Sequence, residues 1–164
     1  MSTAGPLEIR ALTPADAAIG GELVAWMAAA WGFELTPEQV QRRAEELKAA
    51  LRTDDPAKAA RLIARVDGRL AGHCETRRGG DGADPWWVVG LIVDPGRRRN
   101  GIGTALVRAC VEHAHRHGAT AMRAAVRATN LGSIRLHERL GFEHQEAFTA
   151  ENGDENVVLA LSVA

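Results

Sequence analysis

A strand, a loop rich in arginine and glycine, a helix and a second strand follow one another in the middle of the chain, and this order limits the fold more than any other feature. Residues 86–93 are almost entirely apolar and end at Asp94-Pro95, which is typical of a buried strand. Residues 101–117 predict a helix that Gly118 ends, and residues 120–127 predict the next strand. Two strands joined in this way form a right-handed parallel crossover. The chain therefore contains a sheet with a helix packed against it.

The segments on either side of this crossover predict further strands and helices. They are a strand at 7–12, helices that begin at the caps Thr13 and Thr36, strands at 61–66 and 69–77 joined by the turn Asp67-Gly68, a loop at 79–85, a helix at 130–140, and strands at 142–148 and 156–163. We therefore expect an α/β (α+β) fold in which a mixed, mostly antiparallel central sheet of about seven strands carries four helices on its two faces. A single domain would span residues 1–164.

The composition excludes several classes of protein. A net charge of −1 argues against nucleic acid as the main partner, because phosphate binding needs an excess of Lys and Arg on one face. No apolar run approaches the ~20 residues that span a bilayer, and the N-terminal residues lack the pattern of a secretory signal. We expect a cytoplasmic protein that binds neither nucleic acid nor a membrane. Its oligomeric state stays open, with a homodimer as one alternative.

The cysteine and histidine residues give no clear set of metal ligands. Cys74 and Cys110 lack the neighbouring Cys or His of a zinc site, so we expect free thiols in a reducing compartment. Among the three histidines of the helix at 101–117, only His113 and His117 share a face, and no further ligand is evident. Cations near a helix C-terminus are favourable in any case. We therefore expect no metal.

The loop at residues 93–104 has the features of an anion-binding turn. Gly101 and Gly103 permit close backbone approach to a pyrophosphate at a helix N-terminus, and the arginines at 97–99 add positive charge. A P-loop would need Gly-Lys followed by Ser or Thr, a triplet that the sequence does not contain. A dinucleotide fingerprint would need a small residue where Leu106 stands. Both of these phosphate-binding patterns therefore fit poorly.

A third pattern, Val-x-Pro followed by Arg-x-x-Gly-x-Gly, matches residues 93–103. A second group follows it in the chain and consists of Asn130, Ser133, His137 and the Leu-Gly-Phe at 140–142. These two groups resemble the coenzyme A loop and the closing motif of the GNAT superfamily of N-acetyltransferases, and the order of elements is similar to that family across nearly the whole chain. The resemblance implies a GNAT-like sheet whose fourth and fifth strands are splayed, with the pantetheine arm of acetyl-CoA between them.

The resemblance also implies which residues bind acetyl-CoA, the expected cosubstrate. The backbone of the fourth strand would face the pantetheine arm, and the N–H near Leu91 would face the thioester oxygen as an oxyanion donor. Such a donor is worth about 3 kcal/mol in the transition state. The residues implied in coenzyme binding are Leu91, Ile92, Val93, Arg98, Arg99, Asn100, Gly101, Ile102, Gly103, Thr104, Asn130 and Ser133.

The sequence departs from the family at the catalytic groups. It contains no Tyr, and His137 occupies the position where family members commonly place a Tyr near the sulfur. Our hypothesis is that His137 is the general acid for the leaving thiolate, and the alternative is that it only packs on its helix. The fourth strand carries no carboxylate, although many relatives have a Glu there. Glu75 and His73 on the preceding strand share one face and are the nearest candidates for the base. We take Glu75 as the candidate base, with simple surface exposure as the alternative.

Aromatic residues gather where relatives shape the acceptor pocket. Trp26, Trp31 and Phe33 surround the end of the first helix, and we expect hydrophobic burial to explain them, with a place in the acceptor pocket as the alternative. Trp86 and Trp87 point to opposite faces of a strand, and we expect both to pack in the core, with one of them lining the acceptor pocket as the alternative.

These patterns together predict an enzyme, an acyl-CoA N-acyltransferase. It would move an acetyl group from acetyl-CoA to a primary amine of a small molecule or peptide, by direct attack in a ternary complex. The alternative is a non-catalytic domain that binds or senses an acyl-CoA.

Overall fold

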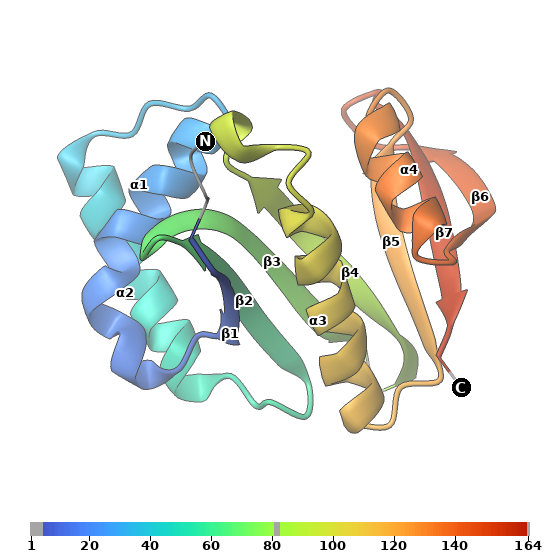
Figure 1. The fold of residues 1–164 in the computed structure, drawn as a ribbon, viewed down its shortest axis with the longest axis horizontal. Helices are drawn as coiled ribbons and strands as arrows, with labels where there is room; N and C mark the ends of the chain where they lie inside the picture. Colours follow the sequence, from blue (N-terminus) through green and yellow to red (C-terminus); the bar gives the residue numbers. More distant parts are fainter. Residues whose placement is uncertain (1–4, 81–82, 164) are drawn as a thin grey trace.

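One seven-stranded sheet runs through the residues that the computed structural model describes, which are 5–80 and 83–163 (Figure 1). Its strands are β1 (Leu7–Ala11), β2 (Ala59–Val66), β3 (Arg69–Gly79), β4 (Ala83–Val93), β5 (Ala121–Arg127), β6 (Glu143–Thr149) and β7 (Glu155–Ser162). The order across the sheet is β1-β2-β3-β4-β5-β7-β6. All neighbouring strands are antiparallel except β4 and β5, which are parallel. This confirms the predicted mixed sheet.

Four α-helices cover the two faces of this sheet. They are α1 (Gly20–Ala30), α2 (Pro37–Thr53), α3 (Ile102–Arg116) and α4 (Leu131–Arg139), with the short 3₁₀ helices η1 (Pro14–Ile19) and η2 (Pro95–Arg97). Side chains that alternate along β2 point to the two faces of the sheet, each of which has its own core. Ile63 packs with Leu23 of α1 and Leu51 of α2, whereas Leu62 belongs to the core that contains Leu106 of α3. In the described part of the chain, none of the helices combines the length and apolar character needed to cross a bilayer.

The local signals at turns and caps act as predicted. Thr36 and Gln39 form a reciprocal capping box at the start of α2, with a 3.2 Å bond from Gln39 N–H to Thr36 Oγ1 and a 2.9 Å bond from Thr36 N–H to Gln39 Oε1. Asp67 and Gly68 have φ of 52° and 73°, as a type I′ turn requires, and join β2 to β3. The predicted hairpin is therefore confirmed.

Two predicted boundaries are wrong. The first helix does not run unbroken from its cap, because it starts as η1 and becomes α1 at Gly20-Gly21, two weak helix formers. The loop at 79–85 is shorter than expected, because Gly79 pairs with Ala83 and extends the hairpin of β3 and β4. Pro85 therefore lies within β4, and residues 81 and 82 of that loop lie outside the described part.

The sheet divides between its two parallel strands. β4 and β5 pair only where residues 86–88 face residues 122–124. Beyond this stretch β4 continues beside β3, and β5 continues beside β7. Figure 1 shows the resulting separation, with β5, β6, β7 and α4 on one side and the other elements on the other. The splay that the family resemblance implied is thus present.

Candidate active site

A cavity of about 560 Å³ lies where β4 and β5 part. Its volume is in the range of roughly 300–1,000 Å³ that small-molecule sites occupy. The residues that line it are Trp31, Phe33, Val88, Gly90, Leu91, Ala124, Ala125, Val126, Arg127, Asn130, Ser133 and His137. Leu91, Asn130, Ser133 and His137, which the family resemblance implies as site residues, all line this cavity.

The cavity extends from one face of the sheet to the other. Along β5, Ala124 and Val126 belong to the core on the side of α3 and α4, so Ala125 and Arg127 point to the opposite face. All of these residues line the cavity, and so does the loop between α1 and α2. Two ligands can therefore approach the middle of the sheet from opposite faces.

A β-bulge reshapes β4 at the cavity. The pairing of β3 with β4 shifts by one residue between His73 and Glu75, and Gly90 takes a φ of 63°. A bulge inserts one extra residue and changes the face to which the following side chains point. Leu91 therefore packs on the same core as Val88, although strict alternation would place them on opposite faces.

His73 contacts this bulge from the neighbouring strand. Its side chain is 2% exposed and hydrogen-bonds the backbone carbonyl of Gly90, while its Nδ1 has no partner. Burial lowers the pKa of His73, and the bond to Gly90 and the charge of Glu75 only partly oppose this effect. Because C=O and N–H of a trans peptide unit point in opposite directions, the bond directs the Leu91 N–H away from His73.

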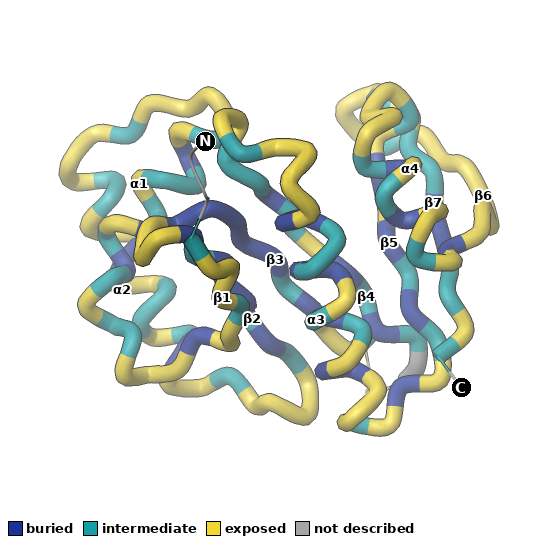
Figure 2. The backbone as a smooth tube through the Cα atoms, viewed as in Figure 1, coloured by how far each residue is buried: buried dark blue, intermediate teal, exposed yellow. Residues whose placement is uncertain are grey.

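The loop between β4 and α3 provides free backbone donors. Arg99 and Gly101 both have positive φ, 67° and 75°, and α3 starts directly after Gly101. The Ala105 N–H donates to the Gly101 carbonyl at 3.0 Å, so the N–H groups of residues 102–104 have no acceptor within the helix. Figure 2 shows that most of the loop before α3 is exposed. These donors and the helix dipole favour a phosphate group.

Two glycines let the start of α3 approach its neighbours closely. A Cβ on Gly72 of β3 would lie 2.7 Å from Leu106 and 3.0 Å from Ile102. A Cβ on Gly103 would lie 2.8 Å from Leu136 of α4. Ile102 and Gly103 are buried, so these two predicted residues offer backbone rather than side-chain groups.

His137 is the one titratable side chain in the cavity lining that is buried, with 2% exposure. Its Nδ1–H donates to the Ser133 carbonyl at 2.8 Å, and its Nε2 has no partner. The ring packs edge-on against Phe142, with 5.1 Å between the ring centroids. Burial lowers the pKa of His137, and the bond to Ser133 opposes this only in part. The imidazole is therefore neutral near pH 7, with Nε2 as a bare acceptor.

Asn130 and Ser133 lie at the start of α4, on the wall that carries His137. Asn130 is the N-cap, and its Oδ1 accepts from the Ser133 N–H at 3.1 Å. Both residues also line the cavity, so Asn130 can cap α4 and contact a ligand in the cavity at the same time.

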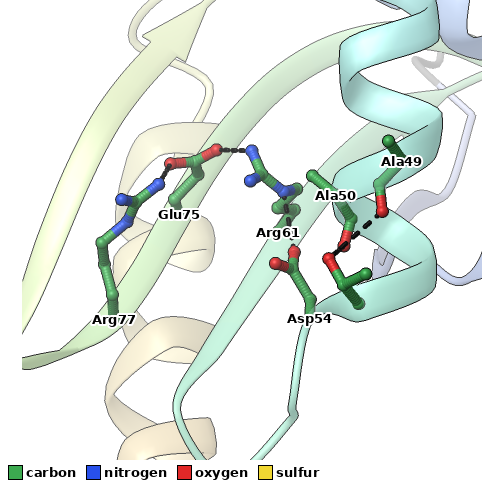
Figure 3. A network of polar contacts seen from close by, with 7 residues as sticks. Ala49, Ala50, Asp54, Arg61, Glu75 and Arg77 are labelled. Carbon is green, nitrogen blue, oxygen red and sulfur yellow. Dashed lines mark hydrogen bonds and ion pairs between the residues drawn. The ribbon is translucent and has the colours of Figure 1, made fainter.

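Glu75 lies outside this cavity lining. Its carboxylate binds Arg61 through Oε1 and Arg77 through Oε2, the latter at 3.0 Å, and Arg61 also binds Asp54 at 3.0 Å (Figure 3). Both carboxylate oxygens are thus engaged by guanidinium groups. A role for Glu75 as a base stays a prediction.

The burial of the aromatic residues differs in part from what the sequence predicts. Trp86 is fully buried, as predicted, whereas Trp87 is half-buried on the opposite face, where the Arg123 guanidinium lies 5.9 Å from its ring. Trp31 and Phe33 are 59% and 61% exposed, so the prediction that they are buried is wrong. The reason is that the loop after α1 reaches the cavity instead of the core.

A model of the acetyltransferase (GNAT) family matches residues 17–142. The chain belongs to the GNAT family. This confirms the resemblance drawn from the coenzyme A loop and the closing motif.

Curated N-acetyltransferases match parts of the chain. A 56-residue segment is 41% identical to the uncharacterized N-acetyltransferase MJ1207 of Methanocaldococcus jannaschii and covers 34% of this chain and 25% of that protein. An 82-residue segment is 28% identical to the ribosomal protein bS18-alanine N-acetyltransferase of Escherichia coli K12 and covers 47% of this chain and 55% of that protein. The matches span a quarter and about half of the length of these relatives.

Solved structures share the GNAT fold along nearly the whole chain. An N-acetyltransferase of Staphylococcus aureus Mu50 superposes with a TM-score of 0.75 and 17% identity, covering 98% of this chain and 100% of that one. YncA of Salmonella typhimurium, solved with its cofactor acetyl-CoA, has a TM-score of 0.69 and 20% identity, covering 98% and 95%. These similarities confirm the predicted fold.

Two residues of this candidate site, Gly90 and Arg127, and the contact of His73 with Gly90 are not among the predictions from sequence. Gly90 has a usable signal, because an isolated glycine within an apolar strand is typical of a bulge. His73 as a partner of Gly90 and Arg127 as a cavity residue have no local signal. Strand pairing and the parting of β4 from β5 bring them to the site.

Proposed function

We propose that the chain is an N-acetyltransferase that moves the acetyl group of acetyl-CoA to a primary amine by direct attack, with both substrates bound at once. The cavity that crosses the sheet carries this proposal, since a thioester can enter from the side of α3 and α4 and an amine from the other face. Membership of the GNAT family supports the reaction, and the acetyl-CoA in YncA supports the cosubstrate.

The residues around α3 and α4 fit a coenzyme with several phosphates. The free N–H groups of residues 102–104 would bind the pyrophosphate, and the exposed Arg98 and Arg99 would pair with phosphates outside the turn. Asn130 and Ser133 would contact the pantetheine arm from the wall of the cavity.

The groups that meet the thioester are the Leu91 N–H and His137. The lone pair of the neutral amine attacks the thioester carbon, and negative charge develops on the thioester oxygen. The Leu91 N–H, directed by the bulge, donates to that oxygen. The carbon–sulfur bond then breaks, and its electron pair stays with sulfur.

His137 supports the movement of the proton. Because its Nδ1–H is committed to the Ser133 carbonyl, Nε2 has to accept a proton before it can donate one. In our proposal Nε2 takes the proton from the attacking nitrogen and gives it to the leaving thiolate, so the hypothesis of a general acid becomes one of a proton relay. The acceptor ammonium first releases a proton to water, and a contribution of Glu75 to that step stays a prediction.

Release of free thiol from acetyl-CoA, measured over a panel of primary amines together with the mass of the product, tests the proposed function. We expect one thiol for each N-acetylated product. A replacement of both Arg98 and Arg99 by Gln should raise KM for acetyl-CoA, whereas Arg43→Gln on the exposed face of α2 should not. A chain that binds acetyl-CoA and releases no thiol with any amine would instead be a non-catalytic acyl-CoA binding domain.

A further inference from the structure

We propose that the acceptor amine is an aromatic α-amino acid, whose carboxylate binds Arg127 and whose ring packs on Trp31 and Phe33. This inference rests on the proposed acetyltransferase function and names the class of its second substrate. The three residues line the cavity on the face of the sheet opposite to α3 and α4.

The charge of this side of the cavity favours an acceptor with a carboxylate. Arg127 is the only residue with a permanent charge among the described residues that line the cavity, and no carboxylate is among them. Arg123 points to the same face four residues earlier on β5, where it lies over Trp87. The positive potential of both guanidinium groups attracts an anionic group and opposes an acceptor with several ammonium groups.

The position of Arg127 suits a carboxylate that is only two bonds away from the reacting amine. The last paired residues of the parallel strands are Val88 and Ala124, and both Leu91 and Arg127 lie three residues beyond them. Allowing for the extra residue of the bulge in β4, Arg127 stands across the splay from the Leu91 N–H, within about one residue of the same depth. A guanidinium that holds an α-carboxylate there keeps the α-amine near the thioester.

The present partner of Arg127 can be displaced. Its Nη2 lies 3.2 Å from Asp154 Oδ2, and the two side chains are 68% and 40% exposed. Ion pairs between exposed side chains are weak, because water competes with them. A bidentate carboxylate in the cavity is a stronger partner for a guanidinium.

The two aromatic rings identify the rest of the acceptor. Trp31 and Phe33 expose most of their surface on the loop between α1 and α2, although large apolar side chains are usually buried. Both line the cavity mouth. Exposed aromatic residues at a cavity mark a place where an apolar or aromatic ligand group binds, with rings offset or edge-on.

The test compares acceptors that differ in one group. We expect kcat/KM for L-phenylalanine and L-tryptophan to exceed that for phenethylamine, which lacks the carboxylate, by about 10- to 100-fold. Phenylalanine amide should behave like phenethylamine, and L-alanine and spermidine should be poor acceptors. Equal values for phenylalanine and phenethylamine, or a preference for spermidine, would overturn the inference.

Variants with opposite expected effects sharpen this test. Arg127→Gln should remove the advantage of phenylalanine over phenethylamine without changing KM for acetyl-CoA, whereas Asp154→Asn should lower KM for phenylalanine because it removes a competing carboxylate. Trp31→Ala and Phe33→Ala should raise KM for phenylalanine. Phe148→Ala, at an exposed phenylalanine of β6 outside the cavity lining, is the matched control.

Failure of this inference differs from failure of the proposed function. If only amines other than amino acids are acetylated with release of thiol, the chain is an N-acetyltransferase as proposed, but the inferred class of acceptor is wrong. If calorimetry shows no binding of acetyl-CoA, or binding occurs and no amine in the panel is acetylated, the proposed function fails and this inference fails with it.

Discussion

At the scale of single residues, two buried histidines, His73 and His137, differ in how they take part in the proposed acetyl transfer. Each keeps one ring nitrogen without a partner, Nδ1 in His73 and Nε2 in His137. The two differ in what they can touch. His137 lines the cavity and can meet a substrate, whereas His73 reaches the site only through the carbonyl of Gly90. We therefore expect His137 to be catalytic and His73 to be a positioning residue.

Replacing His137 by Ala should slow the chemical step. Loss of the Nε2 acceptor removes the proton relay, which predicts a decrease in kcat of about 10²- to 10⁴-fold with a similar Kd for acetyl-CoA. Steady-state kinetics and calorimetry measure the two quantities. His115→Ala, at an exposed histidine of α3, is the control and should leave both unchanged. A His137→Ala variant with normal kcat would mean that the side chain only packs against Phe142.

Replacing His73 by Phe should disturb the bulge while keeping an aromatic ring in the core. The Gly90 carbonyl loses its donor, so the Leu91 N–H is less well directed at the thioester oxygen. We expect kcat to decrease about tenfold, a fraction of the effect of losing an oxyanion donor, while KM for the amine stays similar. His73→Asn retains an N–H donor and should recover part of kcat. Equal losses in both variants would show that packing, and not the bond to Gly90, matters.

At the scale of elements, the bulge in β4 is the feature of the sheet that directs the Leu91 N–H in the proposed reaction. Gly90 and Gly153 form a matched pair, because both have positive φ, 63° and 87°, and a Cβ on either would meet nothing within 4 Å. Ala at each position should therefore cost a similar free energy of unfolding, about 1 kcal/mol. Only Gly90→Ala should also lower kcat, since Gly153 lies in the turn between β6 and β7. Urea unfolding and kinetics on both variants check this, and normal kcat in Gly90→Ala would contradict a role for the bulge.

The elements themselves could be predicted because each carries its own start and stop signals. The capping box of Thr36 and Gln39 and the turn at Asp67 and Gly68 depend on neighbours in the chain, and both are confirmed. The site could be predicted only where its residues belong to such local motifs, as at Asn130. The exposed positions of Trp31 and Phe33 depend on where a loop lies relative to distant strands, and composition gives no indication of that.

At the scale of the whole molecule, burial of three histidines makes the folded chain bind protons less readily than the unfolded chain does. His73 of β3, His113 of α3 and His137 of α4 are at most 8% exposed. His113 donates from Nε2 to the Pro56 carbonyl at 2.7 Å and packs against Trp86. Burial lowers the pKa of each of them below the ordinary value of 6.5. The unfolded chain therefore binds more protons than the folded one once the pH falls below that value.

The free energy of unfolding should consequently decrease as the pH is lowered from about 7 to about 5. Each histidine changes the free energy of unfolding by at most about 1.4 kcal/mol per pH unit. The stability that it adds is fully present above pH 6.5 and is lost as the pH falls through its lowered pKa in the folded state. Carboxylates mostly titrate lower, and the pKa of Asp16 is lowered to about 2 by its hydrogen bond to Arg10, so Asp16 keeps its charge over this range.

Urea unfolding at a series of pH values measures this slope. His137→Gln should reduce the slope by the share of one histidine, whereas His115→Gln, which removes an exposed histidine, should leave it unchanged. A free energy of unfolding that does not change between about pH 7 and pH 5 would mean that the buried imidazoles gain protons in the folded state as readily as in the unfolded chain. Nε2 of His137 would then be mostly protonated below about pH 6.5, so the stability measurement also tests whether the proton relay can work in mildly acidic solution.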